Sequence, residues 1–201
     1  MTTLAPAPTP TPTPVLERLR HATAGRHAEV ESTLRLDSGA PLSRYVMALQ
    51  VFDAFLRAWE PRLLQALPPR LHGFAEARQR GHFATQDLQR LAATRLPGHA
   101  AVLPTLPGRG AALGSLYVLE GSTLGGRVIA RAMHNDFGVG AENGASFFGA
   151  RGPHALGQWH EFCALLEREL GGDEPALAQA CAAANETFAA LSTMFRRQSD
   201  S

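Results

Sequence analysis

A histidine occupies the apolar face of the first helix that the sequence predicts. The residues of this face recur at steps of three and four, which is the period of one side of a helix. They are Leu16, Leu19, Thr23, His27, Val30 and Leu34. A buried imidazole without a hydrogen-bond partner costs about 1–3 kcal/mol, so His27 needs a partner. It is either a core histidine bonded to a backbone carbonyl or a metal ligand.

Two charged residues lie on the same side of this helix. Glu31, one turn after His27, can accept the other ring N–H of a metal-bound imidazole and fix its tautomer. Arg20, two turns before His27, lies roughly 10.5 Å away along the axis, about the reach from a heme iron to its propionates. Arginine pairs well with carboxylates. The alternative is a solvated arginine and a surface glutamate.

A second stretch carries glycines inside a predicted helix. Gly121 and Gly125 are four residues apart and share a face, and Gly126 follows directly. Each glycine in a helix interior costs about 1 kcal/mol relative to alanine, so some other interaction must require the missing side chains. Either a neighbouring helix packs closely here, or a flat ligand lies on the bare backbone. Glycines also allow a bend.

Two polar residues accompany these glycines. Tyr117, one turn before Gly121, either binds a carboxylate at the edge of a ligand or fills core space with its hydroxyl at the rim. Ser122 is the small hydroxyl beside the glycines that could organise water.

Other metal and nucleophile chemistries lack their signatures. Di-iron carboxylate bundles need paired Glu-x-x-His motifs, and the chain has none. There is also no zinc signature, phosphate-binding loop or Gly-x-Ser-x-Gly elbow. The remaining histidines fall on predicted polar faces or loops and are interpreted as surface residues. They are His21, His72, His82, His99, His134, His154 and His160.

Composition narrows the class of protein. The formal net charge is +1 and 18% of residues are charged, which argues against a nucleic-acid or membrane-surface partner. The longest apolar run, residues 111–119, is far short of the ~20 residues of a membrane span, and the N-terminus does not resemble a secretory signal. We therefore expect no membrane insertion and a cytoplasmic location. All basic residues are arginines, so a bound anion would be held by arginine.

The sequence predicts an N-terminal tail followed by one helical domain. Residues 1–14 carry proline at every second position from Pro6, which predicts an extended tail, and residues 15–201 form the domain. Pro61 is expected to start or kink a segment, Thr85 to cap a helix, and Pro175 to lie in a first turn. A loop is expected over 97–107 and a glycine-rich connection over 138–153; no strand is expected. Helices are predicted over 15–34, 42–59, 71–96 with a break near Gly81, 111–135 as the central helix, 154–170 and 175–197.

Two of these segments resemble a known family. Residues 19–31, LRHATAGRHAEVE, resemble the proximal helix of heme oxygenases, and residues 117–126, YVLEGSTLGG, resemble their distal helix. Residues 146–149, SFFG, followed by Trp159, are similar to the bacterial subgroup associated with bacteriophytochromes. The resemblance runs from about residue 15 to 196. It implies an all-α, multi-helical bundle with heme between the first helix and a glycine-bent distal helix.

The resemblance also implies roles for individual residues. His27 would be the proximal iron ligand and Glu31 its hydrogen-bond partner. Ser122 stands where mammalian-type enzymes carry an aspartate that organises water, so the water network would be anchored differently. The other positions implied are Arg20 and Tyr117 at the propionates, Gly121 and Gly125 with Ser122 in the distal wall, and Phe188 and Phe195 lining the pocket.

The activity implied is oxidative cleavage of heme to biliverdin, carbon monoxide and ferrous iron with dioxygen, attack at the alpha meso carbon being favoured. The chain shows no flavin or nicotinamide fingerprint, so electrons would come from an external reductant such as ferredoxin or a reductase. A bacteriophytochrome could accept the biliverdin. Two alternatives stay open: a heme-binding carrier or sensor without turnover, and a helical partner module that binds no heme.

Overall fold

The computed structural model describes residues 13–36, 39–97, 100–149 and 152–200, and every regular element within these ranges is a helix. This confirms the all-α prediction. The α-helices are α1 (Pro14–Leu34), α2 (Leu42–Ala66), α3 (His72–Glu76), α4 (Gly81–Arg90), α5 (Arg109–Phe137), α6 (Ser146–Gly149), α7 (Ala155–Leu170) and α8 (Glu174–Ser199), with 3-10 turns η1 (Pro69–Leu71) and η3 (Gly152–His154).

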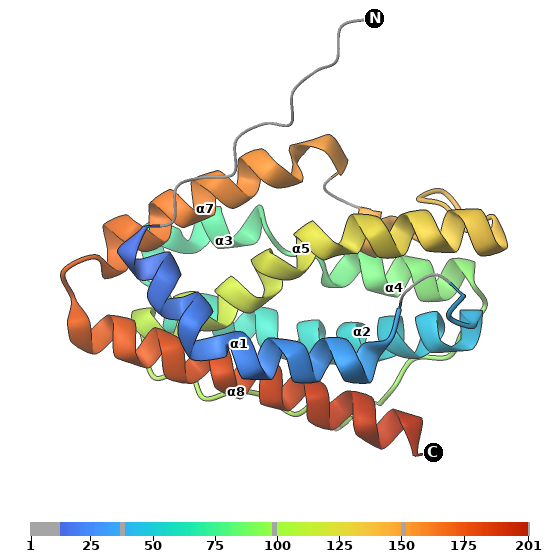
Figure 1. Cartoon of the computed structure of the whole chain (residues 1–201), viewed down its shortest axis with the longest axis horizontal. Coiled ribbons are helices and arrows are strands. Elements are labelled where there is room, and N and C mark those ends of the chain that lie inside the picture. The colour runs from blue at the N-terminus through green and yellow to red at the C-terminus, as the bar shows by residue number, and fades with distance from the viewer. Residues whose placement is uncertain (1–12, 37–38, 98–99, 150–151, 201) are drawn as a thin grey trace, which may run out of the picture.

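Helix α5 runs through the middle of the molecule, as predicted for the segment 111–135. It packs against α2, α6, α7 and α8, while α1 packs on α8 and α7 (Figure 1). In Figure 1, α5 changes direction partway along its length, between α7 on one side and α8 on the other. No helix in the described ranges has the length and apolar character that a membrane crossing requires.

The ends of two helices follow their sequence signals. Thr13 accepts a hydrogen bond from the backbone N–H of Leu16 (3.3 Å) and Pro14 lies in the first turn, so α1 begins one residue earlier than predicted. The predicted tail otherwise lies outside the described residues. Asp173 caps α8 by accepting from the N–H of Ala176 (3.1 Å), and Pro175 lies in the first turn as expected.

Two local predictions were wrong. Pro61 starts no new segment, because α2 continues through it to Ala66 with Leu63 still in the core. Thr85 caps no helix: it lies inside α4, and its hydroxyl donates to Asp53 (2.6 Å). The expected connection over 138–153 does join α5 to α7, and it contains the short helix α6 and most of η3.

A carboxylate from α2 caps α4 instead. Glu60 Oε1 accepts hydrogen bonds from the backbone N–H groups of Arg80 (2.8 Å) and Gly81 (2.9 Å). At the other end of α4, the fully buried Asp87 accepts from the N–H groups of Ser146 (3.0 Å) and Phe147 (2.6 Å), which begin α6. Helix α4 is thus joined to α2 by a half-buried carboxylate and to α6 by a fully buried one.

Glycines let α5 approach the backbone of α8. A Cβ on Gly110 would overlap the carbonyl of Ala176, and a Cβ on Gly114 would overlap the carbonyl of Ala180. In the residue directly after Gly114, the buried Ser115 hydroxyl pairs with that of Thr187 of α8 (2.7 Å). The indole N–H of Trp59 in α2 donates to the same serine (2.8 Å), so three helices share one buried polar cluster.

These contacts make two glycines of α5 respond oppositely to the same substitution. We expect Gly114→Ala to destabilise the protein by about 2–3 kcal/mol, because the added methyl overpacks the α5–α8 contact. Gly125→Ala is the matched control: its Cβ meets no atom within 4 Å, so helix propensity should stabilise the ligand-free protein by up to about 1 kcal/mol. Urea unfolding measures both. Equal effects would contradict this account of the packing.

Candidate functional site

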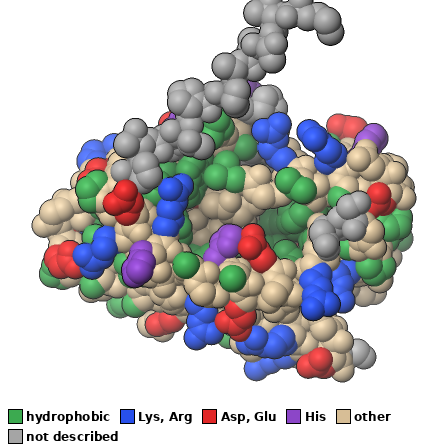
Figure 2. Space-filling model, viewed as in Figure 1, with side chains coloured by type: hydrophobic (Ala, Val, Ile, Leu, Met, Phe, Trp, Pro, Cys, Tyr) green, Lys and Arg blue, Asp and Glu red, His purple; other side chains and the backbone are tan. Residues whose placement is uncertain are grey.

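A large cavity lies between α1 and α5. Its volume is about 970 Å³, near the upper end of the ~300–1,000 Å³ that is usual for small-molecule and cofactor pockets. Both helices pack on α8, which leaves the space between them open. Figure 2 shows this face hollowed, with hydrophobic side chains in the hollow and arginines around it. Phe52 of α2, Phe148 of α6 and Trp159 of α7 complete the lining.

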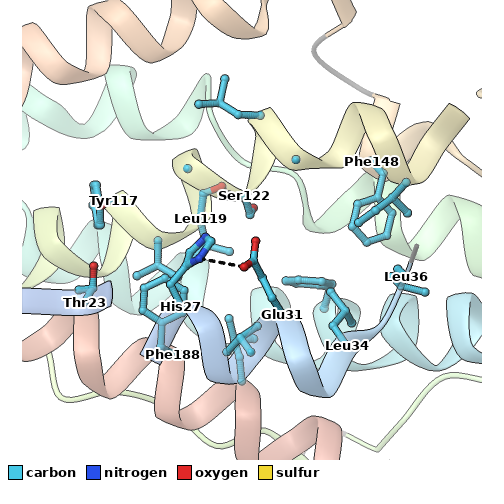
Figure 3. Close-up of a pocket in the computed structure, with 18 of the residues that line it drawn as sticks. Thr23, His27, Glu31, Leu34, Leu36, Tyr117, Leu119, Ser122, Phe148 and Phe188 are labelled. Carbon is cyan, nitrogen blue, oxygen red and sulfur yellow. Dashed lines mark hydrogen bonds and ion pairs between the residues drawn. The ribbon is translucent and has the colours of Figure 1, made fainter. Parts of the chain in front are cut away.

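His27 faces this cavity and not the core. Its side chain is 58% exposed, and its Nδ1 lies 3.4 Å from Oε2 of Glu31, which also lines the cavity (Figure 3). The ring edge packs against Phe188, with centroids 5.6 Å apart and planes at 81°. The expectation of a buried imidazole was therefore wrong. The apolar stripe of α1 is buried only as far as Thr23, and beyond it the same face lines the cavity.

A cation and two hydroxyl groups lie together in the cavity lining. Arg20, Thr23 and Tyr117 line it together. Burial raises the pKa of the Tyr117 phenol, and the Thr23 hydroxyl and the Arg20 charge oppose that rise. Tyr117 therefore keeps its proton at neutral pH and can donate a hydrogen bond beside a cation.

A second arginine lines the cavity at the far end of α1. Arg35 is the C-cap of α1, with a left-handed φ of 43°, and its Nε donates to the carbonyl of Ser32 (3.0 Å). Sequence reasoning missed it. The sequence did contain a signal for it: Arg35 follows His27 by eight residues, and Arg20 precedes His27 by a similar seven.

The glycines of α5 divide into two groups. Gly126 permits close packing, because its Cβ would lie 2.8 Å from the carbonyl oxygen of Phe148. Gly121 and Gly125 line the cavity instead: a Cβ on Gly125 would meet no atom within 4 Å, and one on Gly121 would only touch the Trp159 ring at 3.9 Å. Packing within the protein does not explain these two glycines, whereas a ligand lying on the backbone would.

Two apolar side chains beside these glycines remain in solvent. Leu124 is 38% exposed and Val128 is 68% exposed, and both line the cavity. An apolar ligand in the cavity would cover this apolar surface, which the protein alone leaves exposed to solvent.

The Ser122 hydroxyl is held from behind the cavity wall. It donates to the carbonyl of Leu119 (2.7 Å) and accepts from Nη2 of Arg80 (3.1 Å). Arg80 was not singled out from the sequence, where it lies 42 residues from Ser122 with no motif connecting them. Only the fold brings the two together.

The structure brings together all of the predicted site residues except Phe195. That residue is fully buried, and its ring packs on Phe52 (centroids 5.6 Å apart, planes at 72°), so it lies behind the cavity wall. The residues that line the cavity as expected are Arg20, His27, Glu31, Tyr117, Gly121, Ser122, Gly125 and Phe188.

The other histidines lie away from this lining. His72 and His160 are half-buried and not on the surface as expected; His72 Nε2 bonds to the carbonyl of Leu67 (3.0 Å). His99 lies outside the described residues. The exposed ones are His21, His82, His134 and His154.

The arrangement suits a flat group that carries its own metal. Among the described residues, no three His, Cys, Asp or Glu side chains lie close enough to hold a metal ion. His27 could supply one axial nitrogen to a metal whose other ligands come from a macrocycle. The glycine face of α5 could lie against that macrocycle, and Arg20 with Tyr117 could bind its carboxylates.

Comparisons with known proteins agree with this description. The chain is 33% identical to a heme oxygenase from Xanthomonas campestris pv. campestris (strain 8004) over 149 residues, which cover 74% of this chain and 87% of that protein. It is similar to the NO- and CO-bound heme oxygenase from Neisseria meningitidis, with a TM-score of 0.66, 25% identity and coverage of 92% of this chain and 91% of that one. No family model matches the chain.

The proximity of Arg20 to Tyr117 can be checked by titrating Tyr117. We expect its phenol to ionise above the ordinary pKa of 10.0, and Arg20→Ala to raise that pKa further, because the cation that favours the phenolate is lost. Absorbance at 295 nm, taken as the difference from Tyr117→Phe, isolates this tyrosine from Tyr45. Arg18→Ala, which removes an exposed arginine paired with Glu174, is the control and should not move the pKa. A fall in the pKa of Tyr117 on Arg20→Ala would contradict the arrangement.

Proposed function

Since this chain belongs to the heme oxygenase family, whose members are enzymes that degrade heme, we propose that it binds heme between α1 and α5 and cleaves it to biliverdin, carbon monoxide and ferrous iron. Dioxygen and electrons from an external donor are the co-substrates. The observation that carries the proposal is the placement of His27, exposed in a large cavity that is also lined by the bare backbone of Gly121 and Gly125.

His27 is the proposed iron ligand. Its Nδ1 faces Glu31, so Nε2 is the nitrogen left to bind the metal. A carboxylate on the second ring nitrogen fixes the tautomer and raises the basicity of a ligating imidazole. The Phe188 ring, nearly perpendicular to the imidazole, restricts its rotation from the α8 side.

Arg20 and Tyr117 are the proposed propionate partners. A guanidinium and a protonated phenol offer charge-assisted and neutral hydrogen bonds to one carboxylate-bearing edge. Arg35, at the opposite end of the cavity, is a further cation that an anionic ligand could reach. Arg20 and Tyr117 would orient the macrocycle through its acidic edge and so influence which meso carbon is attacked, with alpha cleavage expected.

Gly121, Ser122 and Gly125 form the proposed distal wall. Heme supplies the iron that reacts with dioxygen and the macrocycle that is oxidised. The glycines allow the backbone to lie against the ligand and limit the space above it. Ser122 offers an oxygen lone pair to water in the cavity, since its hydrogen is donated to Leu119. The protein thereby orients the reactants and positions water that supplies protons.

The proposed partners follow from the chemistry. Electrons come from a separate protein such as ferredoxin or a reductase. A bacteriophytochrome is the proposed biliverdin acceptor, supported by the motif at residues 146–149 and by Trp159. Phe148 and Trp159 from these two segments both line the cavity.

The function is tested by spectroscopy of the protein reconstituted with hemin. Addition of ascorbate or a ferredoxin system in air should remove the Soret band and produce a biliverdin spectrum, and chromatography should identify the alpha isomer. A Soret band that persists under reduction and oxygen would contradict turnover and indicate a heme carrier. Failure to bind hemin at all would exclude both.

The ligand is tested by His27→Ala. We expect loss of the iron–histidine stretch in resonance Raman spectra and of nearly all turnover, because the axial nitrogen is removed. Added imidazole should restore the spectrum, since it can enter the space that the side chain leaves. The control is His21→Ala, an exposed histidine on the same helix that does not line the cavity. An unchanged stretch in His27→Ala would overturn the assignment.

A further inference from the structure

The end of the cavity farthest from Tyr117 is lined mainly by apolar side chains. In Figure 3, Tyr117 lies at one end of the cavity, Phe148 lies at the other, and His27 lies between them. The residues that line the far end are Leu34, Leu36, Phe52 and Phe148, with the exposed Arg35 beside them. A flat ligand whose carboxylates bind beside Tyr117 therefore points its opposite edge at Phe148.

Phe148 belongs to a helix that is too short to be stable by itself. Helix α6 has four residues, and isolated helices of this length do not persist in water. The fully buried Asp87 of α4 holds its start. Oδ1 accepts from the N–H (3.0 Å) and the hydroxyl (2.6 Å) of Ser146, and Oδ2 accepts from the N–H of Phe147 (2.6 Å). One side chain therefore fixes the two residues that precede Phe148.

The connection that leads into α6 is also held by α2 and α4. The Tyr45 hydroxyl donates to the carbonyl of Gly144 (2.9 Å), and Arg90 donates to the carbonyl of Ala141 (2.9 Å). Gly144 has a φ of 136°, and a Cβ added to it would lie 2.7 Å from Cγ of Leu91. Tyr45 is fully buried, so water does not compete for its hydrogen bond. These contacts determine where α6 begins.

The position of α6 in turn determines where the Phe148 ring lies. A Cβ on Gly126 would lie 2.8 Å from the carbonyl oxygen of Phe148, so α6 is in direct contact with the backbone of α5. The Phe148 ring packs on the rings of Tyr45 (centroids 5.7 Å apart) and Phe52 (5.9 Å). With Asp87 bound to one side of α6 and α5 packed on the other, the ring is held at the end of the cavity.

We propose that Phe148 is a specificity-determining residue that limits the size of the ligand edge at this end, and that Asp87 is the positioning residue that holds it there. The edge of heme opposite its propionates carries small apolar groups, a vinyl and a methyl. Groups of this size fit against Phe148, and larger ones are excluded. The identity of the ligand rests on the proposed function, whereas the placement of α6 by Asp87 does not.

The role of Phe148 is tested with two iron porphyrins. Hemin is compared with an analogue that carries butyl groups in place of both vinyl groups, and Soret titration gives the two Kd values. Phe148→Ala should reduce the preference for hemin by about tenfold, because the space of the ring becomes available to the larger groups. The ratio of Kd values is compared between protein variants, so the hydrophobicity of each porphyrin cancels. An unchanged ratio would overturn the role of Phe148.

The role of Asp87 is tested with a matched pair of substitutions. Asp87→Asn keeps the size of the side chain but leaves one oxygen to accept hydrogen bonds, so one N–H at the start of α6 loses its partner. We expect the preference for hemin to fall roughly threefold, since one hydrogen bond is lost. Asp53→Asn is the control: Asp53 is equally buried, but its partners are Arg57, Thr85 and Arg95 and none lies in α6. Its ratio should match that of the unsubstituted protein.

A double variant shows whether Asp87 acts through Phe148. Asp87→Asn should reduce the preference no further in a protein that already carries Phe148→Ala, because the ring that it positions is gone. Independent, additive losses would overturn this account.

Hydrogen exchange of the ligand-free protein separates this inference from the proposed function. Amides of residues 146–149 should exchange roughly tenfold faster in Asp87→Asn than in Asp53→Asn, because only the first loses a bond to α6. This result supports the positioning role even if hemin does not bind, and equal exchange overturns it even if the protein degrades heme. If Asp87→Asn does not fold, Ser146→Ala decides, since it removes the hydroxyl bond to Asp87 and keeps the backbone bonds. Faster exchange in Ser146→Ala supports the role, and unchanged exchange overturns it.

Discussion

The close contact between α5 and α8 is the constraint on which the cavity depends. Gly110 and Gly114 seat the first half of α5 on the α8 backbone, and α1 packs on the same helix. The two helices that form the walls of the cavity, α1 and α5, therefore both pack on α8. Two neighbouring α8 residues show this directly: Thr187 bonds to Ser115 of α5, while Phe188 packs on His27 of α1. The spacing between the imidazole and the glycine wall is thus determined by a third element.

Local signals in the sequence predicted the helices and much of the site. Apolar periodicity located the long helices within a few residues except at the end of α2, which continues seven residues past the predicted end at 59. The motifs at 19–31 and 117–126 brought together residues that the structure places around one cavity. Burial of His27 was predicted wrongly. Periodicity identifies the apolar face of a helix, but it does not distinguish a face that packs on other helices from one that lines a cavity. Pro61 misled for a related reason: tertiary packing of α2 around Trp59 and Leu63 outweighs a single lost backbone hydrogen bond.

Features that depend on long-range contacts had no local signal. Glu60 caps a helix that begins 21 residues later, and Arg80 holds a serine 42 residues away. The glycines of α5 show the same limit within one helix. Gly114 and Gly125 look alike in sequence, yet one is required by the α8 backbone and the other leaves its space open. Close packing explains Gly114 and Gly126, whereas a ligand surface is the proposal for Gly121 and Gly125.

The cavity concentrates features that are unfavourable in the protein alone. Val128 and Leu124 are exposed, Gly121 and Gly125 weaken their helix, and His27 lies outside the core. Elsewhere the local preferences and the packing agree, as in the satisfied cluster of Trp59, Ser115 and Thr187. Departures of this kind gather where a function requires them. Because a bound macrocycle would cover the apolar side chains and fill the glycine face, the same features that destabilise the empty cavity favour the ligand-bound state.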